Sequence, residues 1–132
     1  MSANISSVLI IDDNEMIRML LRTILVSDGY IVVGEASSGG NGLEMARTLR
    51  PQVIFLDIIL PDRNGIEMLQ ELKEILPETI ILMVTSKQDA DSVNASLEHG
   101  ARGYIIKPFK INTVSKTIKN AIARALDAQV SK

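Results

Sequence analysis

The chain has 132 residues, 46% of them hydrophobic, and a formal net charge of −2 at pH 7. This length and composition predict one globular domain with one core, and the small negative charge argues against a protein that grips nucleic acid by itself. The absence of cysteine excludes disulfides, thiol nucleophiles and thiolate metal sites. The apolar run Ile80–Val84 is far too short to span a membrane, and no basic residue precedes Arg18, so we expect a cytoplasmic protein without a secretory signal.

The first strand and helix are predicted between residues 8 and 29. Val8–Ile11 is a short apolar run typical of a strand buried on both faces, and Asp12 and Asp13 follow it directly. Gly29 ends the helix that comes next, as a glycine beyond the last turn commonly does. We interpret Met16 and Met19 as core-filling side chains. The residues expected on the core face of this helix are Met16, Leu20 and Ile24.

A second strand, a helix and a third strand follow. Residues 30–34 are rich in β-branched side chains, which predicts a strand. Residues 37–42 form a Ser/Gly-rich segment without the Lys-Ser/Thr ending of a P-loop, so we interpret it as an ordinary strand-to-helix loop. The helix ends before Pro51, and the buried run Val53–Leu56 then leads directly into Asp57. Taken alone, this stretch favours a turn or helix-capping role for Asp57, and the rest of the chain reverses that interpretation. The core residues expected in this helix are Leu43, Ala46 and Leu49.

The third helix and fourth strand have clear boundaries. Pro61 and Gly65 mark the loop after the third strand, and Pro77 closes the helix. Residues 79–84 predict a fourth buried strand that ends at Thr85. The apolar stripe of the helix consists of Ile66, Leu69, Leu72, Ile75 and Leu76.

The end of the chain contains a weak helix, a strand and a long helix. The helix predicted over residues 89–99 has only Val93 and Leu97 as large apolar residues, so we expect it to be loosely packed and locally unstable. Residues 104–106 predict a fifth strand, which leads into Lys107. The expected core face of the last helix, from about residue 111 to 129, consists of Ile111, Val114, Ile118, Ala121, Ile122, Ala125 and Leu126.

The alternation of five strands with five helices predicts an α/β fold. Short connections between strand and helix imply a doubly wound parallel sheet, (βα)5, with helices on both faces and right-handed crossovers. In such a sheet the carboxyl ends of all strands lie along one edge. The second strand ends without a charged residue, which suits a position at the border of the sheet.

Polar side chains follow four of the five strands at this edge. They are Asp12, Asp13, Asp57, Thr85 and Lys107. At ~4 Å and an effective dielectric constant near 20, each pair of carboxylates repels by roughly 4 kcal/mol, and one lysine offsets only part of that. The remainder favours a divalent cation, and oxygen ligands favour Mg²⁺. Mg²⁺ beside a lysine and a hydroxyl binds phosphoryl groups well, and Asp57 could then act as a nucleophile that forms an acyl phosphate.

These residues make the chain resemble the receiver domains of two-component response regulators, from about Ser7 to Leu126. The resemblance implies a flavodoxin-like sheet with strand order 2-1-3-4-5 and a single stand-alone receiver domain over residues 1–132, without an output domain. It implies a signalling protein rather than an enzyme. The residues that carry the resemblance are Asp12-Asp13, Asp57 with Pro61 and Gly65, Thr85, Tyr104 and Lys107-Pro108-Phe109.

The resemblance also implies a role for each site residue. Asp57 would take a phosphoryl group from a phosphohistidine on a histidine kinase or a histidine phosphotransfer protein. Lys107 would neutralise the phosphoryl oxygens, Thr85 would donate a hydrogen bond to one of them, and the Lys107–Pro108 peptide would be cis. The implied Mg²⁺ ligands are Asp13, Asp57 and the backbone carbonyl of Ile59, with Asp12 binding directly or through water.

Phosphorylation is expected to switch a surface of the protein. Thr85 would move towards the phosphoryl group, Tyr104 would turn inward, and the weak helix at 89–99 would shift. A downstream protein would then bind the surface made by the fourth helix, fifth strand and fifth helix. Ile59 and Lys87 should flank the phosphoryl group, and an apolar Ile59 cannot position an attacking water, so we expect slow self-dephosphorylation. We expect a monomer or weak dimer that does not bind nucleic acid directly.

Two other functions fit these residues less well. An Asp-nucleophile, Mg²⁺-dependent phosphohydrolase needs a second aspartate two residues after the nucleophile, where this chain has Ile59. A flavodoxin-like electron carrier needs a hydroxyl-rich phosphate loop where this chain has Asp12 and Asp13. His99 is interpreted as a surface residue at a helix end rather than a phosphotransfer histidine. Motor control of the chemotaxis type, a phosphorelay intermediate and an adaptor for a separate output protein all remain open.

Overall fold

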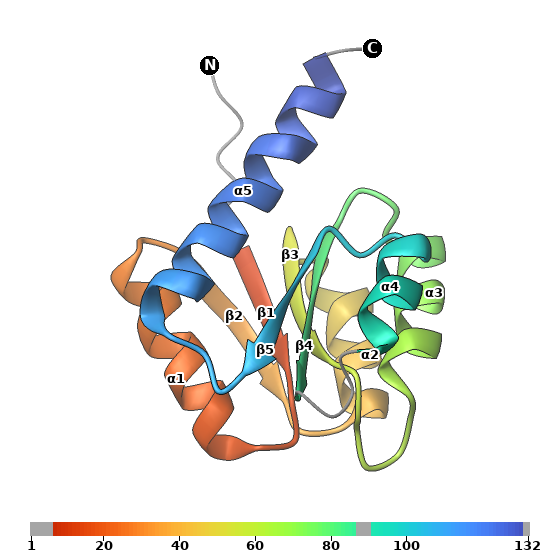
Figure 1. Cartoon of the computed structure of the whole chain (residues 1–132). Coiled ribbons are helices and arrows are strands. Elements are labelled where there is room, and N and C mark those ends of the chain that lie inside the picture. The colour runs from red at the N-terminus through yellow and green to blue at the C-terminus, as the bar shows by residue number, and fades with distance from the viewer. Residues whose placement is uncertain (1–6, 87–90, 131–132) are drawn as a thin grey trace.

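The computed structural model describes residues 7–86 and 91–130 and has the predicted α/β architecture in that part of the chain (Figure 1). Its five strands form one parallel sheet in the order β2-β1-β3-β4-β5. The elements are β1 (Ser7–Ile11), α1 (Glu15–Ser27), β2 (Ile31–Ala36), α2 (Gly39–Leu49), β3 (Val53–Asp57), α3 (Gly65–Ile75), β4 (Ile80–Ser86), α4 (Ser92–Glu98), β5 (Gly103–Lys107) and α5 (Ile111–Val130).

Both faces of the sheet are covered, which explains why its central strands are continuously apolar. Successive side chains of a strand point to opposite faces, so Ile54 and Leu56 belong to one core cluster while Val53 and Phe55 belong to the other. Helices α1 and α5 cover one face, and α2, α3 and α4 lie on the other side (Figure 1). All five residues of β3 are buried, and β3 is the central strand, so Asp57 lies at the carboxyl end of the middle of the sheet.

The core face of α1 differs from the prediction. Met16 is 63% exposed, and Leu20 and Met19 are exposed as well, so the interpretation of both methionines as core side chains was wrong. Ile24 is buried as expected, together with Leu21 and Leu25. The apolar residues of this helix form two overlapping stripes at helical spacing. The sheet contacts the stripe that contains Leu21 and Leu25, not the one that contains Met16 and Leu20.

Helix α2 begins earlier than predicted. Gly39 and Gly40, expected in a loop, form its first turn, because Ser38 accepts a hydrogen bond from the N–H of Asn41 and acts as the N-cap. Leu43 and Ala46 are buried as expected. Leu49 is exposed at the end of the helix beside the border strand β2, so its assignment to the core was wrong.

The last two helices match the prediction except at their ends. Helix α4 covers residues 92–98 of the predicted 89–99, and residues 89 and 90 lie outside the described part of the chain. Val93 is buried and Leu97 is exposed, in keeping with weak packing. The core side of α5 includes Val114, Ile118 and Ala121, with Ile122, Ala125 and Leu126 partly buried. Ile111 is 65% exposed, so its predicted burial was wrong: it is the first residue of α5, ahead of the contact with the sheet.

Within the described residues, no helix is both long and apolar enough to cross a membrane.

Candidate functional site

The carboxyl ends of β1, β3 and β5 bring two buried carboxylates and one ammonium group together. Lys107 Nζ lies 2.9 Å from Asp12 Oδ2 and 3.3 Å from Asp57 Oδ2. Asp12 is 1% exposed and Asp57 is 5% exposed, so this lysine joins two charges that are almost fully shielded from water. The adjacent Asp13 is exposed, and one oxygen from each of the three aspartates lies within 4.8 Å of the others. The structure therefore gathers the charged residues that the sequence placed at this edge.

Asp12 is fixed by its neighbours on several sides. Its Oδ1 accepts a hydrogen bond from the backbone N–H of Asn14 at 2.8 Å, and its carbonyl accepts one from Arg18 Nη1 at 2.7 Å. Its Oδ2 is buried and, among the described residues, accepts no well-oriented hydrogen bond; the Lys107 ammonium is its ion-pair partner. Such an oxygen still has acceptor capacity for a further ligand.

Three carboxylates lie close together, and Lys107 pairs with only two of them, so the site has excess negative charge. An all-oxygen set with an exposed member matches what a hydrated divalent cation such as Mg²⁺ binds. Asp12, Asp13 and Asp57 could hold that cation, because their oxygens converge and Asp13 is exposed to solvent. A bound divalent cation would offset the repulsion among them and attract a phosphoryl group.

Burial and the neighbouring charges shift the pKa of both Asp57 and Lys107. Burial and the neighbouring Asp12 raise the pKa of Asp57 to about 6, although Lys107 and the N–H of Ile59 oppose this shift. Burial lowers the pKa of Lys107, but the facing Asp12 and Asp57 carboxylates outweigh it and raise that pKa above its ordinary value. Lys107 therefore stays charged at neutral pH.

The loop after β3 closes tightly over Asp57. The Ile59 N–H donates to Asp57 Oδ1 at 3.1 Å, the Gly65 N–H donates to the Ile58 carbonyl at 2.7 Å, and Ile59 pairs with Asn64 in a single antiparallel bridge. A Cβ on Gly65 would lie 2.2 Å from the Asp57 carbonyl oxygen, so only glycine allows this approach. The Ile59 side chain is exposed beside the carboxylate. The role of the Ile59 carbonyl as a metal ligand stays a prediction.

The predicted switch residues Thr85 and Tyr104 lie on β4, the strand next to β3, and on β5 at the border of the sheet, respectively. Asp57 pairs with Val84 in the sheet register, so Thr85 lies one residue further along β4. Thr85 is buried, and its hydroxyl donates to the Ser86 carbonyl at 3.3 Å. Tyr104 on β5 is exposed, and its inward turn stays a prediction. The Lys107–Pro108 peptide is cis, the geometry that the resemblance implied. Lys87 lies outside the described residues.

Two residues near the site were not recognised from the sequence. Arg18 contacts the Asp12 backbone, and its position six residues later, on the helix that follows, could have suggested this. Asp62 accepts hydrogen bonds from the N–H groups of Gly39 at 2.7 Å and Gly40 at 2.9 Å, so it joins the loop after β3 to the first turn of α2. Because those partners lie more than twenty residues earlier, no local pattern marks this contact.

Comparison with known proteins agrees with the geometry. The family model described as "Response regulator receiver domain" matches residues 8–119. The chemotaxis protein CheY of Thermotoga maritima is 33% identical over 111 residues, which cover 84% of this chain and 92% of that protein. The corresponding CheY of Halobacterium salinarum is 36% identical over 115 residues, which cover 87% and 95%. A solved CheY-like receiver domain protein from Methanospirillum hungatei has a TM-score of 0.86 and 28% identity, with coverage of 95% and 99%.

Receiver domains of this kind carry phosphoryl groups in two-component signalling, interact with histidine kinases and downstream targets, and act as signals rather than as enzymes. The acidic cluster at the sheet edge fits a phosphorylation site of that type. The fold, the site and the relatives agree that the chain belongs to the response-regulator receiver-domain family and is a phosphoacceptor of the CheY-like kind.

Proposed function

We propose that Asp57 is the phosphoacceptor and that a phosphohistidine on a histidine kinase or a phosphotransfer protein is its donor. The observation that carries this proposal is the environment of Asp57: a nearly buried carboxylate, 3.3 Å from Lys107, at the end of the central strand and within an acidic cluster. A carboxylate oxygen attacks phosphorus, and the P–N bond to the donor imidazole breaks. The electron pair returns to the imidazole nitrogen, and the product on this chain is an acyl phosphate.

The neighbouring side chains supply what this transfer needs. Lys107 stays charged and neutralises the phosphoryl oxygens, and the Thr85 hydroxyl, now on the Ser86 carbonyl, can turn to donate to one of them. We assign Mg²⁺ to Asp13, Asp57 and the Ile59 carbonyl, with Asp12 binding directly or through water; when bound, it supplies further positive charge for the transferred group. The phosphohydrolase is not favoured, because Ile59 occupies the position of its second aspartate.

The chain then works as a switch for a downstream protein. Phosphorylation adds about −1.5 to −2 charges at the sheet edge. Movement of Thr85 leaves space for Tyr104, which is exposed on the adjacent strand, and α4 shifts easily because Val93 is its only large buried apolar residue among those described. The partner binds the surface of α4, β5 and α5. Hydrogen exchange with and without beryllofluoride should change most over residues 86–104, whereas changes confined to Asp57 would contradict this switch.

The remaining parts of the proposal concern context. We propose that residues 1–132 hold a single receiver domain, which is a monomer or weak dimer and does not bind nucleic acid directly. It works in the cytoplasm, where kinases that use ATP form phosphohistidine. A pull-down with and without beryllofluoride, with Asp57→Asn as the blank, would identify the partner that binds only the activated state.

The central test is phosphorylation by a small donor. Incubation with acetyl phosphate and Mg²⁺ should add the mass of one phosphoryl group to the intact chain, and hydroxylamine should remove it, as expected for an acyl phosphate. Asp57→Asn should remain unmodified. Asp62→Asn is the matched control, because it makes the same change in the same loop at an exposed carboxylate and should still be phosphorylated. Wild-type protein that stays unmodified would refute the proposal.

A further inference from the structure

Arg18 connects the border strand β2 to the backbone of the acidic pair. Its side chain is only 16% exposed, its Nη1 donates to the Asp12 carbonyl at 2.7 Å, and its Nε lies 3.5 Å from Glu35 Oε1. Glu35 also forms an ion pair with Arg22, one turn further along α1. The next residue of β2, Ala36, accepts the Asp12 N–H at 3.0 Å. The two polar groups of the Asp12 backbone are therefore both held from the β2 side, one directly and one through Arg18.

This contact matters because, in the described part of the chain, no other side chain bonds to the peptide between Asp12 and Asp13. Among the described residues, the Asp13 carboxylate has no hydrogen bond or ion pair, and it is exposed. Its position near Asp12 and Asp57 therefore depends on the orientation of the peptide that joins Asp12 to Asp13. The carbonyl of that peptide is the one that Arg18 binds. Without the guanidinium, the peptide would lose its one side-chain partner and Asp13 would be free to move away from the cluster.

We propose that Arg18 is a positioning residue for the divalent-cation site: it fixes the Asp12–Asp13 peptide so that Asp13 is preorganised as a ligand, and Glu35 orients Arg18. This inference rests on the proposed function, because it assumes that the acidic cluster binds Mg²⁺. Residues that orient ligands from outside the coordination sphere commonly change metal affinity by about ten- to a hundredfold.

A positioning role and a charge effect predict opposite signs. Removal of a positive charge near three carboxylates strengthens the through-space attraction for Mg²⁺, whereas loss of a positioning contact weakens binding. Arg22 provides the matched control, since it lies on the same helix and pairs with the same Glu35, but its side chain is 44% exposed and its recorded contact is with Glu35, not with the Asp12 carbonyl.

The experiment is a Mg²⁺ titration of the full chain followed by backbone amide shifts of Asn14 and Ile59. We expect Arg18→Met to raise the Kd about tenfold, and Glu35→Gln to raise it by a smaller factor. Arg22→Met should leave the Kd within about twofold of wild type, or lower it, because only charge is lost. The Kd of Arg18→Lys should fall between those of wild type and Arg18→Met. A lysine ammonium can reach the Asp12 carbonyl, but it cannot bind that carbonyl and Glu35 together as the planar guanidinium does.

The outcomes separate this inference from the function on which it rests. Arg18→Met that binds Mg²⁺ as tightly as wild type, or more tightly, would overturn the positioning role while the metal site stands. Equal weakening in Arg18→Met and Arg22→Met would also overturn it. If Arg18→Met does not fold, Arg18→Lys decides, provided that its melting temperature matches wild type. Wild-type protein that does not bind Mg²⁺ would overturn both the inference and the assigned metal site.

Discussion

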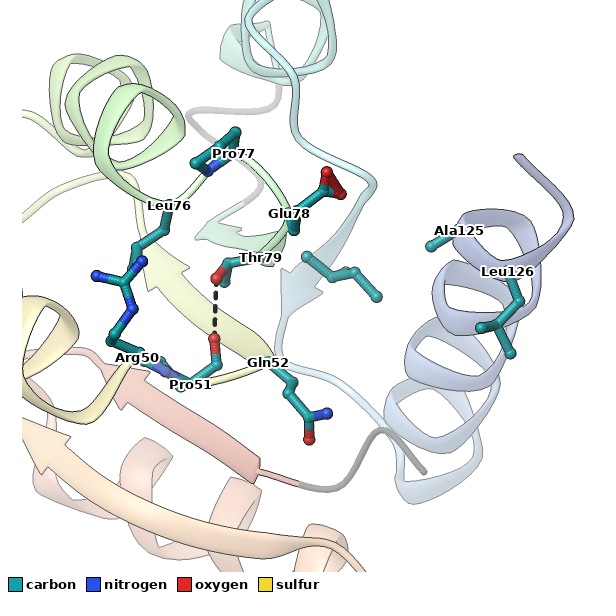
Figure 2. A pocket seen from close by; sticks show the side chains of 10 residues that line it. Arg50, Pro51, Gln52, Leu76, Pro77, Glu78, Thr79, Ala125 and Leu126 are labelled. Carbon is teal, nitrogen blue, oxygen red and sulfur yellow. Dashed lines mark hydrogen bonds between the residues drawn. The ribbon is translucent and has the colours of Figure 1, made fainter. Parts of the chain in front are cut away.

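The two edges of the sheet differ in a way that shows where the chemistry lies. At the amino edge there is a cavity of about 420 Å³, open between the loops before β3 and β4 and the outer part of α5 (Figure 2). At the carboxyl edge, Lys107 lies between two buried carboxylates with a third at the surface. The cavity at the amino edge is not the candidate functional site, because unbalanced charge, rather than volume, marks the place where a ligand is needed.

Two polar side chains at the amino edge, Thr79 and Lys73, donate hydrogen bonds to backbone carbonyls. Thr79 Oγ1 donates to the Pro51 carbonyl at 2.8 Å, the bond drawn in Figure 2. Lys73 Nζ donates to the carbonyls of Pro77 and Thr79, each at 3.0 Å. These hydrogen bonds hold the connections that lead from a helix into the next strand. We therefore expect substitutions at the amino edge to change stability alone, and substitutions at the carboxyl edge to change phosphorylation as well.

Lys107→Met should have the largest effect, because it removes the cation that Asp12 and Asp57 share. We expect phosphorylation by acetyl phosphate to slow roughly a hundredfold. The free energy of unfolding at pH 7 should fall by about 2–3 kcal/mol, since two carboxylates lose their partner. Quench-flow mass spectrometry and urea unfolding would measure these changes. Lys110→Met, an exposed lysine nearby, is the control, and equal behaviour of the two variants would remove the distinction between the edges.

Gly65→Ala should have the next largest effect, because the added Cβ would lie 2.2 Å from the Asp57 carbonyl oxygen. We expect a loss of about 2–3 kcal/mol in the free energy of unfolding, together with slower phosphorylation as Asp57 and Ile59 move. Gly40→Ala is the matched control: its Cβ would make an ordinary contact of 3.4 Å with Asp62 Oδ2, so stability should change little or rise by up to about 0.5 kcal/mol. A Gly65→Ala protein with normal stability and rate would show that the close approach is not required.

Thr79→Val tests the amino edge. It leaves the Pro51 carbonyl without its hydroxyl partner in a buried position, which should cost about 1–2 kcal/mol of unfolding free energy. The rate of phosphorylation should remain that of wild type. Thr117→Val removes a hydroxyl that binds the Thr113 carbonyl within α5 and should cost less than about 0.5 kcal/mol. A slower phosphorylation of Thr79→Val would mean that the two edges are coupled.

Asp62→Asn should have the smallest effect, and its pH dependence identifies the cause. The N–H groups of Gly40 and Gly39 hold the pKa of Asp62 below its ordinary value in the folded protein. The carboxylate therefore stabilises the fold above the pKa of the unfolded chain, and this stabilisation is lost as the pH falls through the lower folded-state pKa. Urea midpoints should show Asp62→Asn as slightly less stable than wild type at pH 7, with the difference disappearing in acid.

The control for this pH dependence is Asp91→Asn. Asp91 stands at the start of α4 without a capping hydrogen bond from its side chain, so its replacement should give no such pattern. A difference between Asp62→Asn and wild type that persists unchanged into acid would exclude the carboxylate as its source.

The sequence predicted four of the strands and their polar ends because each of these four is a compact apolar run followed directly by a candidate site residue. Val53–Leu56 followed by Asp57 is the clearest example, and the structure places it at the centre of the sheet. The resemblance supplied the strand order, which periodicity alone does not give.

The errors have a common cause in contacts that arise between distant elements. Helix α1 has two apolar stripes, and only docking on the sheet decides that Leu21 rather than Leu20 is buried. Helix α2 starts at Gly39, where two N–H groups bind Asp62 from a later loop, so the Ser/Gly pattern alone indicated a longer loop. Arg18 looked like one of several helix cations until the turn of the chain at Asp12 brought it to the backbone.

The position of Lys107 has a consequence for synthesis on the ribosome. This residue ends β5, the last strand to be made, and lies fifty residues after Asp57, with which it pairs. A nascent chain that has released β1 to β4 already carries Asp57 but lacks its counter-charge. If Asp57 is the acceptor as proposed, phosphoryl transfer to an unfinished chain should therefore be slow, and incomplete molecules would contribute little to the signal.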